Sequence, residues 1–371
     1  MPLKILHTSD IHIGMRFNNY PDEVRGKLVE ARISVLDRLI DIANKEQCDL
    51  FIIAGDLFDK ISKIAKKDIV SVIKSLDQFS GECVLVMPGN HDYDNGMTEL
   101  WDTFSKNITG KIVLLNENSI YNLNNYDIDG VIYPAHCDSK HSDTNNLSWI
   151  KELEDKPDVK WHIGIAHGAL QGISPDIDNR YFNMSERELV DIGLDLWCLG
   201  HTHIPYPNTS IIDSSNVFNP GTPEPDGMDC KHGGNAFIID IDDNKDIKAT
   251  AVETGKYRFY DLKYIVEDER DFEKIEEELL SNSPNRKMVR LKLTGRLNKE
   301  VYDIKGDYYK KFNSNLGYFN VDDSELKIKI TKEIIEKEFT KDSFPHKLLN
   351  SLADEEGAMQ LAYELIKEVK K

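Results

Sequence analysis

The chain has 371 residues, a formal net charge of −19 and 40% hydrophobic residues. This length fits one large domain and a small one, with ample apolar material for a core. The acidic balance argues against a protein that holds nucleic acid by broad neutralisation of phosphates, because such proteins carry an excess of lysine and arginine. No signal peptide or bilayer-spanning apolar stretch is visible, so we expect a soluble, cytoplasmic protein.

The five cysteines indicate a reducing compartment. They are scattered along the chain, and no two of them form a Cys-x-x-Cys pair. An odd number without paired spacing is typical of reduced, buried thiols in a cytosolic protein. A zinc-thiolate site is therefore not expected.

The N-terminal region alternates strand and helix patterns. Apolar runs that read as buried strands cover residues 4–6, 50–54 and 83–87. Between them, residues 22–44 and 65–79 have apolar residues at helical spacing. This β-α-β-α-β order predicts an α/β layered fold in which a polar block follows each strand.

The pattern from residue 112 to 160 is less regular, but further strands are expected downstream. They cover residues 130–133, 162–166, 196–199 and 236–241, and the last of them closes the sheet. Ser185-Glu186-Arg187-Glu188 is a capping box that opens a helix to about residue 192.

Near Gly255 the pattern changes to that of a small α+β domain. Strands are expected at 260–266, 288–293 and 326–330, with a helix at 271–280. The last thirty residues form an amphipathic helix that is interrupted near 355–357. We therefore predict three parts, which are a domain at 1–256, a small α+β domain at 257–341 and a helical segment at 342–371.

Polar blocks at the expected strand ends carry the chemistry of the chain. Each block brings carboxylate, amide or imidazole groups to the same edge of the predicted fold. Seven mixed nitrogen and oxygen ligands are too many for one ion and suit two, as in sites that attack phosphate esters. The blocks are Asp10-Ile11-His12, Gly55-Asp56-Leu57-Phe58-Asp59, Gly89-Asn90-His91-Asp92, His167, and Gly200-His201-Thr202-His203.

Together these blocks resemble the calcineurin-like metallophosphoesterase superfamily. The opening Ile-Leu-His-Thr-Ser-Asp-Ile-His-Ile-Gly is similar to that of the SbcD nucleases, the bacterial counterparts of the meiotic recombination eleven nuclease. The resemblance covers residues 1–240 in blocks and is only architectural beyond them. It implies a layered α/β/β/α core with a small α+β capping domain.

The resemblance also implies a role for each polar residue. Asp10, His12 and His203 would hold one divalent ion, Asn90, His167 and His201 would hold the other, and Asp56 would bridge the two. Ions in such pairs lie roughly 3.5–4 Å apart. The ligand set fits manganese, iron or zinc better than magnesium, and the resemblance favours manganese.

His91 looks like the catalytic histidine of the family that is not a ligand. It would position the phosphate and protonate the leaving oxygen. Asp59 matches the carboxylate that orients this histidine in many superfamily phosphatases, whereas several meiotic recombination eleven enzymes have histidine there. The alternative for Asp59 is a helix N-cap.

The resemblance predicts a metal-dependent DNA exonuclease or endonuclease that acts in a repair complex with an SbcC-type coiled-coil ATPase. Attack would yield 5′-phosphorylated products, and the chain would form a homodimer through helices of the first domain. The alternative is a phosphatase or phosphodiesterase for nucleotides or other small esters, which Asp59 and the negative charge favour. A non-catalytic scaffold is a third class, although every ligand position is filled.

Four further features have two interpretations each. The cations Lys287, Arg290, Lys292 and Arg296 are either a solvated sheet face or a guide for DNA. The helical segment at 342–371 either packs on its own domain or docks on the ATPase. Asn219-Pro220-Gly221-Thr222 is either a plain turn or a loop near the metals, and His136 is a weaker candidate for facing the site.

Overall fold

The computed structural model describes residues 2–62, 64–176, 178 and 180–369, which form two compact units. The first unit ends at Phe259 and the second begins at Tyr260. Each unit is described by itself. Among the described residues, no helix is both long enough and apolar enough to cross a bilayer.

The first unit contains a seven-stranded mixed sheet. Strands β1 to β4 are parallel to one another, whereas β11 pairs antiparallel with β1. Beyond β11 the sheet continues with the antiparallel strands β12 and β9. The strands, in spatial order, are β4 (Ile112–Leu114), β3 (Cys83–Met87), β2 (Leu50–Ala54), β1 (Leu3–Thr8), β11 (Asn235–Ile241), β12 (Ile247–Glu253) and β9 (Ile211–Ile212).

A five-stranded sheet faces the first one. Its strands β6, β7, β8 and β10 are parallel, and β5 adds an antiparallel edge. In spatial order they are β10 (Val217–Phe218), β8 (Leu196–Gly200), β7 (Trp161–His167), β6 (Gly130–Ala135) and β5 (Tyr121–Asn122).

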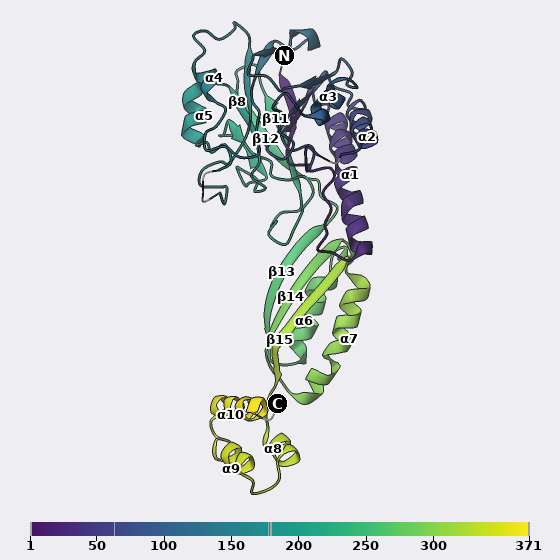
Figure 1. The fold of residues 1–371 in the computed structure, drawn as a ribbon, viewed down its shortest axis with the longest axis vertical. Coiled ribbons are helices and arrows are strands. Elements are labelled where there is room, and N and C mark those ends of the chain that lie inside the picture. The colour runs from purple at the N-terminus through teal and green to yellow at the C-terminus, as the bar shows by residue number, and fades with distance from the viewer. Residues whose placement is uncertain (1, 63, 177, 179, 370–371) are drawn as a thin grey trace. The chain divides into compact units, whose positions relative to one another are not determined.

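Alternating side chains place helices on the outer face of each sheet (Figure 1). In the seven-stranded sheet, Phe51 faces the helices, whereas Ile52 packs between the two sheets with Ile163 of the other sheet. Helices α1 (Asp22–Lys45), α2 (Lys66–Leu76) and α3 (Glu99–Ser105) cover the first sheet. Helices α4 (Ser148–Lys151) and α5 (Glu186–Ile192) cover the second. This arrangement is the α/β/β/α layering that the resemblance implies.

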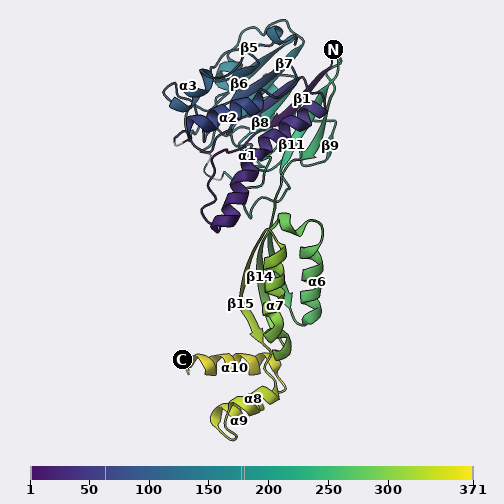
Figure 2. The same ribbon diagram turned by 90° about the vertical axis from the view of Figure 1, so that its right-hand side faces the viewer.

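The second unit is a three-stranded sheet with two helices. Its strands are β13 (Arg258–Val266), β14 (Lys287–Leu297) and β15 (Tyr318–Ile328), in that order. Figure 2 shows α6 (Glu269–Leu280) and α7 (Lys299–Asn315) along one face of this sheet. Phe272, Leu291 and Phe312 belong to the core that joins the helices to the sheet.

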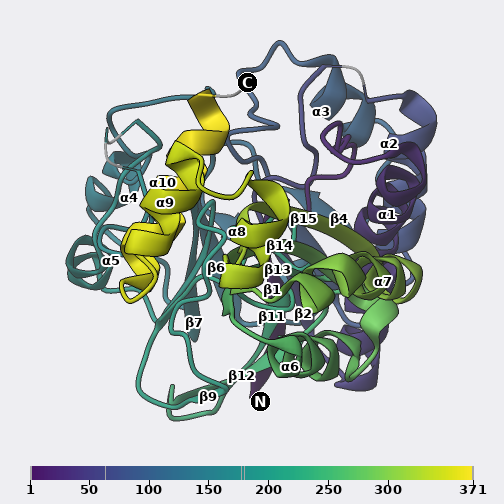
Figure 3. The ribbon, with the colours of Figure 1, turned by 90° about the horizontal axis from the view of Figure 1, so that it is seen from below.

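Three short helices end the chain and have a small core of their own. They are α8 (Lys332–Glu338), α9 (Phe344–Ser351) and α10 (Glu356–Val369), and Figure 3 shows α9 beside α10. Ile335, Leu349 and Met359 are buried in that core. The two remaining short elements are the 3₁₀ turns η1 (Asn124–Tyr126) and η2 (Pro284–Arg286).

Most predicted elements are present, and the differences have local causes. The capping box at Ser185 opens α5 as predicted, and all five cysteines are buried free thiols. The strand at 236–241 does not close its sheet, because β12 and β9 pair beyond it. The sequence of β12 gives little strand signal, since alanine and threonine replace the large apolar residues. Helix α7 was not predicted, and its apolar stripe is thin because Phe312 is its buried residue.

We predict that the two units unfold separately. Phe312→Ala should destabilise the second unit by about 3–5 kcal/mol, because a fully buried ring is replaced by a cavity. All four tryptophans lie in the first unit, so urea unfolding followed by tryptophan fluorescence should keep its midpoint while a circular dichroism transition shifts. As the matched control, Phe51→Ala should shift the fluorescence midpoint. A fluorescence shift in the Phe312 variant would contradict independent unfolding.

Candidate active site

The ends of five strands bring the polar blocks together. Asp10 and His12 follow β1, Asp56 follows β2, and Asn90 follows β3 in the seven-stranded sheet. From the five-stranded sheet, β7 ends at His167, and β8 is followed by the block that carries the last two histidines. Because parallel strands present their carboxyl ends at one edge, the site forms where the two sheets meet.

The backbone of this site is held in an unusual conformation. Asp10, His12 and Asp56 have φ values of 55°, 51° and 54°, and His201 has a φ of 92°. Such left-handed values are uncommon outside glycine and are held only when neighbouring contacts fix them. Here the His12 amide donates to the Asp56 carbonyl at 2.9 Å. The first two loops therefore fix each other.

Two positions in the site require glycine, because a side chain from another strand lies too close to leave room for a Cβ atom. A Cβ atom on Gly55, whose φ is 94°, would lie 2.0 Å from Nδ1 of His167. A Cβ atom on Gly89 would lie 2.2 Å from Oδ1 of Asp56. The glycine of each block thus makes room for a polar side chain from another strand.

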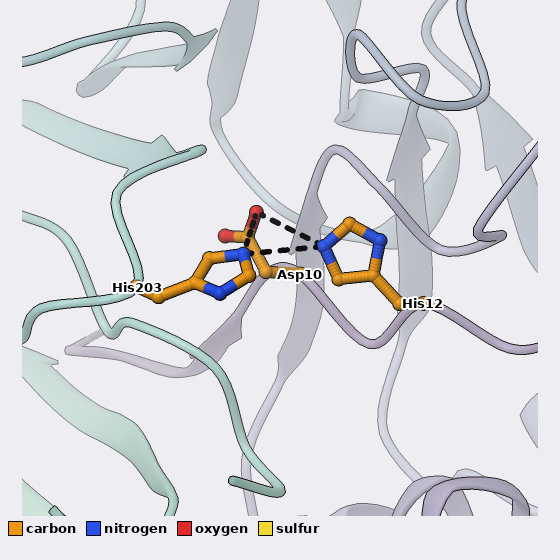
Figure 4. Close-up of side chains that lie close together, drawn as sticks. All are labelled: Asp10, His12 and His203. Carbon is orange, nitrogen blue, oxygen red and sulfur yellow. Dashed lines mark hydrogen bonds and ion pairs between the residues drawn. The ribbon is translucent and has the colours of Figure 1, made fainter. Parts of the chain in front are cut away.

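Asp10, His12 and His203 form one group of potential ligands (Figure 4). The Nε2 atoms of the two histidines are 3.2 Å apart. Oδ1 of Asp10 lies 3.8 Å from Nε2 of His12 and 3.5 Å from Nε2 of His203. Two ligands that each lie about 2.1 Å from one ion are roughly 3 Å apart, so this spacing fits a shared ion.

Asn90, His167 and His201 form a second group. Oδ1 of Asn90 lies 3.1 Å from Nε2 of His167 and 2.9 Å from Nδ1 of His201. Asp56 lies between the groups, because its Oδ2 atom is 3.4 Å from Nε2 of His167 and 3.7 Å from Nε2 of His12. All seven predicted ligand residues are thus brought together.

The electrostatics of the site favour cations. Burial raises the pKa of Asp10, but the hydrogen bond and charge of His203, together with the charge of His167, lower it to about 2. The pKa of Asp56 is lowered in the same way by His167. Burial lowers the pKa of His12 to about 3, which keeps the ring neutral and able to act as a ligand at neutral pH.

Asp10 provides the most direct test of whether a metal fits. Its side chain is fully buried, and among the described residues Oδ1 has no hydrogen-bond partner. A buried anionic oxygen without a donor is costly unless a cation compensates it. The donor set and its spacing therefore fit divalent metal ions.

His91 lies beside the two groups and lines the cleft above them. Its amide donates to Oδ1 of Asp56 at 2.8 Å, and its ring meets that of His12 edge-on with centroids 4.8 Å apart. Nδ1 of His91 lies 3.1 Å from the main-chain carbonyl of Asp59. The Asp59 carboxylate, the partner that the resemblance implies, has an oxygen within 4.8 Å of a ring nitrogen of His91 and of one of His12, and it also lies 3.7 Å from Nζ of Lys60. Asp59 caps no helix, since α2 begins at Lys66.

Two buried supports of the site were not predicted from the sequence. Asp92 accepts hydrogen bonds from the amides of Phe58 and Gly89 at 2.9 and 2.7 Å, and burial beside Asp56 raises its pKa to about 8. Arg32 of α1 is 1% exposed and donates to the Ile11 carbonyl at 3.2 Å. The sequence holds one signal that could have identified Arg32, because this cation lies on the apolar stripe of the helix predicted at 22–44.

The cleft above the site has a volume of about 1220 Å³. His141 and Tyr181 line it, and the Tyr181 ring lies against that of His201 with centroids 5.0 Å apart. Its charged lining beyond the ligands includes Asp176, Asp178, Asp229, Arg180 and Lys231. His136, the weaker candidate, is 7% exposed and is not among the lining residues that the structure describes.

Comparison with known proteins agrees with this geometry. The sequence model of the calcineurin-like phosphoesterase family matches residues 3–205, which contain all nine predicted site residues. The uncharacterized metallophosphoesterase YhaO of Bacillus subtilis is 27% identical over 217 residues, which are 54% of this chain and 48% of YhaO.

Two similar proteins are named as nuclease or repair proteins. The SbcD subunit of the SbcCD nuclease of Staphylococcus saprophyticus is 27% identical over 228 residues, covering 55% of this chain and 57% of that protein. The DNA double-strand break repair protein Mre11 of Saccharolobus solfataricus is 28% identical over 261 residues, covering 67% and 63%. The chain thus spans between about half and two thirds of each of these relatives.

The family match covers more than half of the chain, and the strand-end blocks inside it converge on one site with the donor set of a metal-dependent hydrolase. The chain belongs to the calcineurin-like phosphoesterase family and is a metallophosphoesterase.

Proposed function

We propose that this metallophosphoesterase is a manganese-dependent nuclease that hydrolyses DNA phosphodiester bonds. The observation that carries the proposal is the arrangement of seven side chains in two groups that share Asp56. The similarity to proteins named as a nuclease subunit and a double-strand break repair protein supports DNA as the substrate. Iron and zinc are the alternative metals for this ligand set.

The resemblance divides the seven ligands between two ions. Asp10, His12 and His203 would hold one ion, and Asn90, His167 and His201 the other. Asp56 faces both groups through the same oxygen, Oδ2, and would bridge them. Two ions held there would lower the pKa of an attacking water and stabilise the charge of the phosphate oxygens.

His91 would act on the leaving oxygen. Because the Asp59 carbonyl can only accept, Nδ1 of His91 carries the proton of their hydrogen bond. A proton for the leaving oxygen would then come from Nε2 of the imidazolium form. In this proposal Asp59 orients His91 through its main chain, which differs from the carboxylate role that the resemblance implies.

The cations of the second unit do not support a DNA guide. Arg290 makes two hydrogen bonds to the Asp261 carboxylate at 2.9 and 2.6 Å. Lys292 pairs with Glu325 at 2.5 Å, and Nζ of Lys287 donates to the Glu278 carbonyl at 2.8 Å. The ion pairs of Arg290 and Lys292 favour a solvated sheet face, whereas Lys287 is buried. Affinity for DNA would come from the metals and from a partner.

The charge of the cleft favours a second candidate function. Asp176, Asp178 and Asp229 line it beside two basic residues, and Arg180 is 3.8 Å from Asp178. An acidic rim repels a polyanion more strongly than it repels a small ester. A phosphatase or phosphodiesterase for nucleotides or other small esters is therefore the alternative.

The C-terminal helices offer a docking surface for a partner. Part of the predicted apolar stripe, including Ala362 and Ile366, packs on the core of these helices. On another face of α10, Leu361, Leu365 and Val369 are 57%, 53% and 88% exposed. We propose that segment 342–371 docks on the coiled coil of an SbcC-type ATPase through this exposed face.

Helices α1 and α2 carry the proposed homodimer contact. A cavity of about 600 Å³ lies between residues of the two helices and has Val29, Ile33 and Val72 in its lining. Ile33 is 52% exposed. An exposed β-branched side chain beside a cavity of mixed apolar and polar lining fits the same surface of a second copy.

The substrate is tested by cleavage of end-labelled single- and double-stranded DNA and of a chromogenic phosphodiester, with Mn²⁺ present. We expect DNA degradation that falls by about 10²–10⁴-fold in His91→Ala, because the proton donor is lost. Mn²⁺ binding should be unchanged in this variant. Hydrolysis of the small ester alone, even with an SbcC-type ATPase added, would favour the second candidate.

The bridging role of Asp56 is tested by Asp56→Asn. We expect binding of both Mn²⁺ ions to weaken, because one buried anion serves both groups, and hydrolysis of either substrate to be lost. Isothermal titration calorimetry after chelator treatment would measure both sites. Unchanged affinity and activity would contradict the two-metal assignment.

Docking is tested by Leu361→Asp combined with Leu365→Asp. A charge on the exposed face of α10 should weaken binding to the ATPase at least tenfold, since it would have to be desolvated in the interface. Met97→Asp is the matched control, because Met97 is an 85% exposed apolar residue of the first unit. Equal binding by both proteins in a pull-down and by calorimetry would exclude this surface.

A further inference from the structure

The turn at residues 219–222 is built into the active site. The Asn219 side-chain amide donates to the carbonyls on either side of His203, at 2.6 and 2.8 Å. Oγ1 of Thr222 lies 3.0 Å from the carbonyl of Asp10. The turn therefore fixes the two chain segments that carry a ligand of the first group.

The same loop is anchored again two residues later. Glu224 is 1% exposed, and its carboxylate accepts hydrogen bonds from the amides of Lys256 and Tyr257 at 2.8 and 2.9 Å. It also pairs with Arg38 of α1 at 2.5 Å. A buried carboxylate with three donors leaves its backbone little freedom, so the position of Asp226 is well defined.

Asp226 contacts Nδ1 of His203, which is the ring nitrogen that does not face the other ligands of the first group. Its Oδ2 atom lies 2.8 Å from Nδ1 of His203. Because an ionised carboxylate can only accept, Nδ1 carries the proton and the neutral ring has its lone pair on Nε2. Nε2 is the atom that faces Asp10 and His12, at 3.5 and 3.2 Å.

The group that contacts Nδ1 is a charged carboxylate for His203 and a neutral carbonyl for His167. Nδ1 of His167 lies 2.8 Å from the main-chain carbonyl of Ala54, which is a neutral acceptor. A carboxylate behind an imidazole raises its strength as a ligand more than a carbonyl does, and it fixes the plane of the ring. The ring of His203 is also 33% exposed, so packing restrains it less than the fully buried His167.

We propose that Asp226 is a positioning residue that selects the tautomer of His203 and strengthens its Nε2 atom as a ligand for a divalent cation. The proposal rests on the proposed function in one respect, which is the assignment of His203 as a ligand. It adds a third carboxylate, besides Asp10 and Asp56, to the charge that the site presents to cations.

Mn²⁺ binding to the full chain tests the proposal without an activity assay. Electron paramagnetic resonance of free Mn²⁺ would give the affinity of each of two ions in the wild type and in Asp226→Ala. We expect Asp226→Ala to weaken the binding of one Mn²⁺ ion by about 10–100-fold and to leave the affinity for the other ion unchanged. Combined with His203→Ala, it should cause no loss beyond that of His203→Ala alone. Asp213→Ala, an exposed carboxylate of the first unit outside the described lining of the cleft, should bind as the wild type does.

Asp226→Asn distinguishes loss of the carboxylate charge from a folding defect, because asparagine keeps the shape of the side chain and one acceptor oxygen. It should weaken the same ion by a smaller factor, and circular dichroism in chelator would confirm that each variant is folded. Wild-type Mn²⁺ affinity in Asp226→Asn would overturn the proposal while leaving His203 a ligand. The same conclusion would follow if the loss of affinity in the double variant equalled the sum of the losses from Asp226→Ala and His203→Ala. Wild-type affinity in His203→Ala would instead refute the ligand assignment and this inference with it.

Discussion

Two carboxylates, Asp10 and Asp56, are buried in one site, and the structure around them serves to make that burial tolerable. An ionised carboxylate removed from water costs several kcal/mol unless charge and hydrogen bonds compensate it. The amide of His201 donates to Asp10 and that of His91 to Asp56, at 2.9 and 2.8 Å. What remains uncompensated is the side of each carboxylate that faces the imidazoles, and this is where divalent cations fit.

The fold supplies this environment through its strand ends. Parallel strands in two facing sheets bring five loops to one edge, and the loops hold one another in left-handed conformations that would be unfavourable alone. Arg32 reaches this edge from α1 and brings a buried cation to the carbonyl of Ile11. The layers are packed for stability, and the strained loops between them carry the chemistry.

The second unit contributes differently, because its polar surface is internally paired. Ion pairs such as Lys305 with Asp323 at 2.7 Å and Arg290 with Asp261 at 2.6 Å neutralise many of its cations. Exposed ion pairs of this kind add little stability. Its distinctive surface is instead the apolar face of α10. Catalysis and partner binding would therefore reside in separate units of the chain, each with its own core.

The sequence by itself predicted the α/β layering, most of its long strands and the polar blocks at their ends, because these depend on local signals, whereas the choice of seven ligands among the blocks rests on the family resemblance. Apolar runs and the polar blocks that end them can be read within a few residues. Only the tertiary structure decided which atom of Asp59 forms a hydrogen bond with His91, which part of the C-terminal stripe is buried, and that Arg290 and Lys292 of β14 form ion pairs. It also revealed Asp226 behind His203 and Arg32 beneath Asp10. These contacts join residues that are far apart in sequence or use main-chain atoms, and neither leaves a periodic pattern along the chain.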